Sequence, residues 1–175
     1  MQTGYRILKS LPEVLRRADF KVTATVGRRA GVLEVMLVEP GDTSRRNFGV
    51  AVDVGTTTVV VHLVDLTTGE TLAAEATYNS QMRYGEDYIQ RIIYAEEHDA
   101  FDEMQRLVVE DINGLIEEAA RSAGVRVQDI FAVMIENAYM SKTFFTPQDC
   151  RKFVFNYTKK LVEEIRKYGI LCYRT

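Results

Sequence analysis

Two strongly apolar segments joined by a turn of glycine and threonine limit what this chain can fold into. The stretch FGVAVDVGTTTVVVHLVDLTTGE, residues 48–70, predicts strands near residues 49–54 and 58–65. Both strands are apolar at nearly every position, which is typical of strands covered on both faces. A second turn, LTTGE, and a third strand in TLAAEATYN extend the pair into a meander.

Helical periodicity follows the meander. The segment YGEDYIQRIIYAEE has Tyr88, Ile92 and Ala95 at helical spacing, and a longer helix is predicted after Asp99, with Gly124 as its stop. The stripe that this longer helix would bury consists of Met104, Val108, Ile112, Leu115 and Ala119. A fourth strand is predicted in DIFAVMIE. The order of strands and helices places residues 48–132 in the α/β class.

The segments on either side of this region carry their own patterns. In residues 1–47, SLPEVLRRAD predicts a short helix with Ser10 as its N-cap and Pro12 in its first turn. FKVTATV and VLEVMLVEP predict a hairpin around GRRAG. In residues 133–175, a helix is predicted from Thr146 to Gly169, and ILCYRT begins another strand. We therefore expect three parts, residues 1–47, 48–132 and 133–175.

Composition excludes several classes of function. The net charge is -3 and the pI is near 5.5, so the chain has no basic footprint for nucleic acid. No apolar run approaches the roughly 18 residues that span a bilayer, and the N-terminus has no signal-peptide pattern, so we expect a cytoplasmic protein without a membrane partner. The lone residues Cys150, Cys172, His62 and His98 lack ligand spacing, which argues against a zinc or iron-sulfur site in this chain.

The turn in VDVGTTT admits two interpretations. Threonine is a good strand residue and Asp53 can cap a tight bend, so the pattern can be purely structural. The alternative is a phosphate site: Gly55 lets the backbone approach a ligand, and successive N–H groups in the bend form an anion-binding concavity. Thr56, Thr57 and Thr58 would add hydroxyl donors, and Asp53 would position Mg²⁺ or its water. That arrangement suits a nucleoside triphosphate.

The motifs also resemble a known family. VAVDVGTTTVVVHLVDLTTGETLA resembles the first phosphate-binding hairpin of the ASKHA superfamily of kinases, chaperones and actin. NSQMRYGEDYIQRIIYA, residues 79–95, resembles the segment that follows this hairpin in reductive activators of corrinoid proteins. The upstream LPEVLRRADFKVTATVGRRAGVLEVMLVEPGD is similar to the stretch preceding their ATPase domain, so the resemblance covers about residues 10–132.

This resemblance implies an RNase H-like (actin-like ATPase) lobe with ATP in a cleft. It implies ATP-driven electron delivery that returns Co(II) corrinoid to Co(I), with a corrinoid protein or methyltransferase as partner. Asp53 would assist Mg²⁺, while Gly55, Thr56, Thr57 and Thr58 would surround the terminal phosphates. Arg83, Tyr84 and Asp87, in the helix opening RYGED, serve either helix-start packing or an interface.

The chain departs from that family in two places. It lacks the cysteines of the activators' iron-sulfur domain, and it ends before the second phosphate loop and the adenosine-binding segment, so a truncated protein is expected. Residues 133–175, with FFTP and RKFVFNYTKKLVEEIRKYG, resemble a strand-helix-strand piece of the uroporphyrinogen decarboxylase-like barrel, which includes corrinoid methyltransferases. Cys172 there lacks the accompanying histidine of a zinc site, so zinc is not expected.

Three functional hypotheses remain open at this point. The first is an ATP-dependent corrinoid-activation protein, incomplete at its end. The second is a methyltransferase-related fragment joined near Ala132. The third is a non-catalytic interaction module whose unpaired strand edges favour homo-oligomers and leave the monomer marginally stable.

Overall fold

The computed structural model describes residues 2–29, 31–136 and 171–173. The chain divides into two compact units, Met1–Asn47 and Phe48–Thr175. Each unit has its own sheet, so the two are described separately.

The first unit is a small sheet with one helix. It contains β1 (Gln2–Thr3), α1 (Tyr5–Arg17), β2 (Val22–Arg29) and β3 (Val32–Pro40). The strand order is β1-β3-β2, with β2 antiparallel and β1 parallel to β3. The predicted hairpin is therefore confirmed, and α1 packs against β3.

The predicted start of α1 is wrong. The helix begins at Tyr5 with Gly4 as its N-cap, so Ser10 lies inside it and donates its hydroxyl to the carbonyl of Ile7 at 3.2 Å. Pro12 also lies inside the helix rather than in its first turn. The helix as a whole contacts β3, and tertiary packing can outweigh the capping propensity of a single residue such as Ser10.

The second unit is built on a five-stranded sheet. It contains β4 (Phe48–Val54), β5 (Thr58–Asp65), β6 (Glu70–Tyr78), β7 (Ile130–Glu136) and β8 (Leu171–Tyr173), in the order β6-β5-β4-β7-β8. β4, β5 and β6 form the predicted antiparallel meander, while β7 joins β4 in parallel and β8 joins β7 in parallel. The mixed sheet and its helices confirm the α/β class.

Two α-helices and two short 3₁₀ helices connect β6 to β7. They are η1 (Ser80–Tyr84), α2 (Tyr88–His98), α3 (Phe101–Ala123) and η2 (Val127–Asp129). α3 stops where predicted, because Gly124 adopts a left-handed conformation with φ 67°. The sequence did not predict η1.

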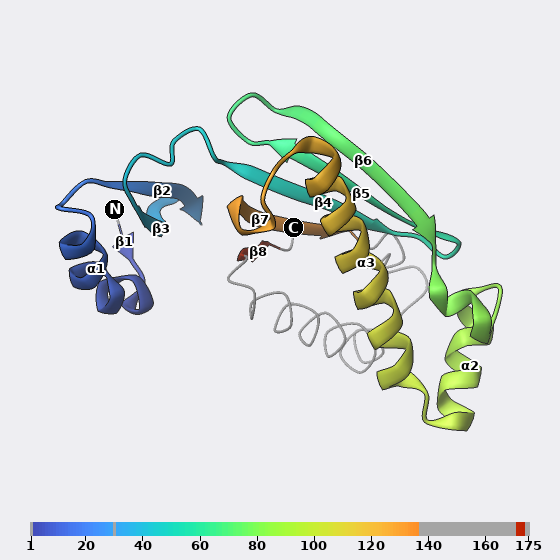
Figure 1. Cartoon of the computed structure of the whole chain (residues 1–175). Helices are drawn as coiled ribbons and strands as arrows, with labels where there is room; N and C mark the ends of the chain where they lie inside the picture. Colours follow the sequence, from blue (N-terminus) through green and yellow to red (C-terminus); the bar gives the residue numbers. More distant parts are fainter. Residues whose placement is uncertain (1, 30, 137–170, 174–175) are drawn as a thin grey trace. The chain divides into compact units, whose positions relative to one another are not determined.

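The core lies between α3 and one face of the sheet, which α3 crosses (Figure 1). The predicted stripe of α3 is buried at every position. Met104 packs with Ala95 and Ala100, and the rest of the stripe packs with alternating strand residues: Val50, Val52, Val59, Val61, Leu63 and Val133. The opposite face is not covered to the same degree by the described residues, because Asp53 and His62 are exposed there. The expectation that both faces of β4 and β5 are covered is therefore not met at these positions.

The end of the chain joins the same sheet. Ala132 of β7 pairs with Leu171 of β8, and Val133 pairs with Cys172. The expected strand at ILCYRT is confirmed, and its pairing with β7 was not predicted from the sequence. The predicted helix at 146–169 lies outside the described residues.

Candidate functional site

The turn between β4 and β5 is the candidate phosphate site. It closes through a hydrogen bond from the Gly55 amide to the Thr58 carbonyl, with an N···O distance of 2.9 Å. A Cβ atom at Gly55 would lie 2.8 Å from that carbonyl oxygen, closer than real Cβ contacts allow. Glycine is therefore needed at position 55 for the closure of the turn itself.

Three successive carbonyls of the turn face the same two residues. The Gly55 carbonyl accepts from Asn79 Nδ2 at 2.9 Å, and the Thr57 carbonyl accepts from the Asn79 amide at 2.8 Å. Between them, the Thr56 carbonyl accepts from Arg91 Nη2 at 2.6 Å. All three carbonyls therefore accept hydrogen bonds from the residue that caps η1 or from a residue of α2.

The amides of the turn point the other way. All described peptide bonds are trans, and in a trans peptide the C=O and the following N–H have opposite directions. Because the carbonyls of residues 55, 56 and 57 face Asn79 and Arg91, the N–H groups of Thr56, Thr57 and Thr58 are directed away from these two residues. Successive N–H groups on one side of a bend form a concavity that attracts anions.

Asp53 lies one residue before the end of β4. Its side chain is exposed, and its Cα is in register with Val60 of β5 and Glu136 of β7. The described residues contain no group of three or more His, Cys, Asp or Glu side chains placed to hold a metal. In nucleotide sites Mg²⁺ is usually held by one or two carboxylates together with phosphate and water oxygens, so a single carboxylate such as Asp53 is compatible with that kind of site.

Asn79 connects the turn to the helices. Its Oδ1 accepts from the Gln81 amide at 3.0 Å and so caps η1, while its Nδ2 contacts the turn. The next residue, Ser80, donates its amide and its hydroxyl to the two carboxylate oxygens of Asp111 at 2.8 and 2.7 Å. The turn is therefore tied through η1 to the middle of α3.

Arg91 holds the turn from α2. Its side chain is buried, and besides Thr56 it contacts the Gly85 carbonyl through Nε at 2.9 Å. Neither this role of Arg91 nor that of Asn79 was predicted from the sequence. One signal was available, because Arg91 precedes the buried Ala95 by four residues and so shares its inward helix face.

The RYGED residues pack the start of α2, as one of the two interpretations expected. Asp87 accepts from the Gln90 amide at 2.9 Å and is the N-cap, and Arg83 donates from Nε to the Ser80 carbonyl at 3.2 Å. The rings of Tyr84 and Tyr94 lie 4.9 Å apart. A hydrogen bond with Glu103 holds the pKa of the Tyr84 phenol above its ordinary value.

Comparison with known families covers almost the whole chain. The model for the RACo middle region matches residues 48–166, and the model for the RACo linker region matches residues 1–45. The chain belongs to the RACo family. The match of the RACo middle region runs without a break past residue 132, so nothing supports a change there to the uroporphyrinogen decarboxylase-like family.

Two relatives agree with the RACo assignment. "Corrinoid activation enzyme RamQ" of Eubacterium limosum is 26% identical over 142 residues, which is 80% of this chain and 24% of that protein. A solved structure titled "Reductive activator for corrinoid,iron-sulfur protein" is 39% identical, with a TM-score of 0.67 over 76% of this chain and 21% of its own. This RACo chain thus spans less than a quarter of the length of each relative.

The histidines and cysteines considered above as metal ligands are part of no metal-binding group in the described part of this RACo chain. His62 is exposed on β5, and Nδ1 of His98 lies 3.0 Å from the Tyr94 carbonyl oxygen. Cys172 is in β8, and Cys150 lies outside the described residues. Among the helices that the structure describes, none is long and apolar enough to cross a membrane.

Proposed function

We propose that this chain supplies the first phosphate-binding turn of an ATP-dependent activator of corrinoid proteins. In that activity, ATP hydrolysis accompanies the transfer of one electron to Co(II) corrinoid, which gives Co(I). The partner is the corrinoid protein or a methyltransferase that carries it. Membership of the RACo family and the titles of both relatives support this role.

The single observation that carries the proposal is the direction of the turn's peptides. The carbonyls of Gly55, Thr56 and Thr57 are all engaged by Asn79 and Arg91. This leaves the following amides directed toward the other side, where phosphate oxygens accept hydrogen bonds. A turn that served only to reverse the chain has no need of donors brought from η1 and α2.

The residues of the turn have distinct roles in this proposal. The amides of Thr56 to Thr58 donate to phosphate oxygens, and the hydroxyls add further donors. Gly55 permits the tight closure, and Asp53 binds Mg²⁺ or its water beside the phosphates. The second unit is an RNase H-like lobe, which is supported by its antiparallel meander continued by two parallel strands.

Calorimetric titration of the 175-residue chain with Mg·ATP tests the proposal. We expect saturable binding that Asp53→Asn weakens on the order of tenfold, because the ion loses a charged ligand. Thr67→Ala is the matched control, since Thr67 lies in the next hairpin turn and its amide contact with Asp65 does not use the hydroxyl. Amide resonances of Thr56 to Thr58 should shift on titration, and those of residues 66–69 should not.

Failure to bind Mg·ATP at millimolar concentration would overturn the proposed phosphate site. Binding that shifts both hairpin turns equally would also count against it, because it would indicate attraction without a defined site. If binding is found, reduction of a Co(II) corrinoid protein in the presence and absence of ATP is the next measurement.

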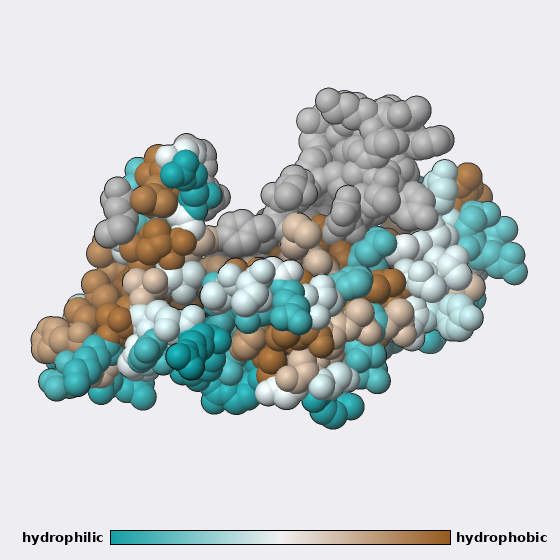
Figure 2. Space-filling model, turned by 90° about the horizontal axis from the view of Figure 1, so that it is seen from above, coloured by the Kyte–Doolittle hydropathy of each residue, from teal (hydrophilic) through white to brown (hydrophobic). Residues whose placement is uncertain are grey.

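A non-catalytic interaction module is the second candidate. The apolar side chains of Leu66, Leu72 and Met134 are exposed, and Met134 follows Val133, which is buried in the core that contains α3. On the face drawn in Figure 2, hydrophobic residues are interspersed with hydrophilic ones among the described residues. Sedimentation equilibrium tests this candidate: it requires self-association that Met134→Glu reduces, whereas a monomer at all concentrations would exclude the homo-oligomer.

A further inference from the structure

Two polar side chains of the second unit are buried although polar groups favour the surface. Asn79 is 2% exposed and Arg91 is 7% exposed, and both contact the 55–58 turn. A buried arginine is costly unless its donors are used, because its charge has been removed from water. The burial of Arg91 therefore calls for a structural explanation.

Two hydrogen bonds of Arg91 join segments that are distant in sequence. Nη2 reaches the Thr56 carbonyl at 2.6 Å and Nε reaches the Gly85 carbonyl at 2.9 Å. The guanidinium plane fixes the directions of both donors at once. The peptide between Thr56 and Thr57 is thereby held in one orientation relative to α2.

Gly85 makes this arrangement possible. It is the C-cap of η1, and a Cβ atom there would lie 2.6 Å from Gln90 Cβ and 3.0 Å from the Arg91 amide nitrogen. Only a residue without a side chain allows the backbone to come this close to the first turn of α2. The connection between η1 and α2 therefore passes close to the backbone of Arg91.

We infer that Arg91 is a positioning residue of the phosphate site. It contacts the turn on the side away from the ligand and fixes the peptide whose amide faces the ligand. Arg91 holds the Thr56 carbonyl, and the same peptide unit carries the Thr57 N–H on its opposite side. Asn79 does the same for the two neighbouring peptides. This inference rests on the proposed function, since it assigns a role within that site.

The substitution Arg91→Lys separates geometry from charge. Lysine keeps the positive charge and a similar length, but its single ammonium group cannot reproduce the planar fork that joins Thr56 to Gly85. If only the charge near the turn mattered, lysine would suffice. If the orientation of the peptide matters, lysine fails.

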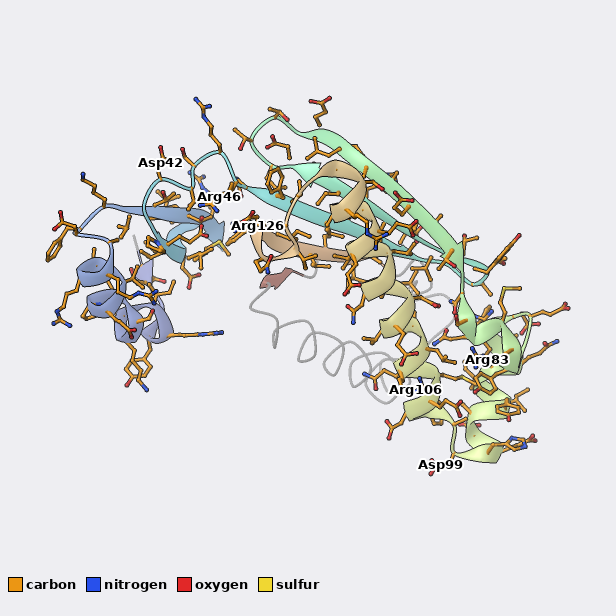
Figure 3. The ribbon with its side chains drawn as sticks, in the orientation of Figure 1. Asp42, Arg46, Arg83, Asp99, Arg106 and Arg126 are labelled. Carbon is orange, nitrogen blue, oxygen red and sulfur yellow. The ribbon has the colours of Figure 1, made fainter. Side chains whose placement is uncertain are left out.

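The experiment compares four forms of the full chain: wild type, Arg91→Lys, Arg106→Lys and Ile112→Val. Arg106 lies exposed on α3 and pairs with Glu110, so it controls for the same substitution outside the turn (Figure 3). Ile112 is fully buried in the core, so its truncation lowers stability without touching the turn. Binding of Mg·ATP and of Mg·tripolyphosphate is measured by calorimetry well below each melting temperature.

We expect Arg91→Lys to bind both ligands on the order of tenfold more weakly or worse, since a charge-assisted hydrogen bond that fixes the site is lost. The amide resonances of Thr56 and Thr57 should also move in the free protein. The variants at positions 106 and 112 should bind as the wild type does.

Wild-type affinity in folded Arg91→Lys would overturn the inference and leave the proposed function intact. Equal weakening in Ile112→Val would also overturn it, because loss of stability alone would then account for the effect. Absence of binding in the wild type itself would overturn the proposed function instead, so the two failures are distinguishable.

Discussion

The second unit contains two consecutive hairpin turns of similar composition that are stabilised in opposite ways. The turn after β5 supplies its own contacts: Asp65 accepts from the amides of Thr67 and Gly69, and Thr68 Oγ1 accepts from the Glu70 amide. The turn after β4 depends on Asn79 and Arg91, which are distant in sequence. A turn that only reverses the chain can be stabilised by contacts among its own residues. A turn whose amides all face one side needs donors from elsewhere in the fold for the carbonyls on the other side.

The largest expected effect is the loss of Arg91. Arg91→Met leaves the Thr56 and Gly85 carbonyls without their charged donor and should lower the free energy of unfolding by about 3 kcal/mol. Arg106→Met should cost less than about 1 kcal/mol, because the side chain and its pairing are exposed. Urea unfolding of both variants gives the comparison, and equal losses would show that the first turn needs no support from α2.

Removing Asn79 should have the next largest effect. Asn79→Ala loses both the η1 cap and the donor to the Gly55 carbonyl, so we expect about 2 kcal/mol of destabilisation. Asn79→Asp keeps the capping acceptor but places a buried carboxylate oxygen against the Gly55 carbonyl, so it should destabilise the fold at least as much as Asn79→Ala. An aspartate variant more stable than the alanine variant would show that the contact with the Gly55 carbonyl contributes little.

The second turn should tolerate more. Asp65→Ala removes the acceptor for the Thr67 amide in an exposed turn, and we expect a loss of about 1 kcal/mol or less. Binding of Mg·ATP should be unchanged by this variant. A loss as large as that of Arg91→Met would contradict the division into a locally held and a remotely held turn.

The smallest expected effect concerns Tyr84, which lies in η1, the helix that is capped by Asn79 beside the first turn. Its pKa is raised in the folded chain by the hydrogen bond with Glu103. The stabilising contribution is therefore fully present below the unfolded pKa of about 10 and is lost as the pH rises through the folded value. Difference absorbance between wild type and Tyr84→Phe reports that pKa, and Glu103→Gln should return it toward its ordinary value.

Most of the fold followed from local patterns in the sequence. The apolar runs of β4 and β5, the buried stripe of α3 and the stop at Gly124 each depend on residues that are close together in the chain. The start of α1 did not follow, because Ser10 and Pro12, which are typical of a helix start, lie inside the helix. The pairing of β8 with β7 was also missed, since a parallel pairing joins distant segments and leaves no mark in either strand.

The candidate site also contains residues that the sequence predicted and residues that it did not. The glycine and threonines at 55–58 and the carboxylate at 53 could be read from their spacing, and their roles in binding remain predictions. The residues that hold the turn lie 24 and 35 positions away from the carbonyls they contact. No local rule connects an arginine in a helix to a carbonyl in an earlier hairpin, so only the fold shows why Arg91 is buried.

The helix that holds the turn also has an outward side. Ile89 and Ile93 lie on either side of Arg91 in sequence, and they are 54% and 50% exposed. If a partner that covers this side of α2 changes the affinity of the turn for a ligand, the ligand must change the affinity of α2 for that partner by the same factor. Partner binding measured with and without a ligand at the turn is therefore a second way to detect occupancy of the turn.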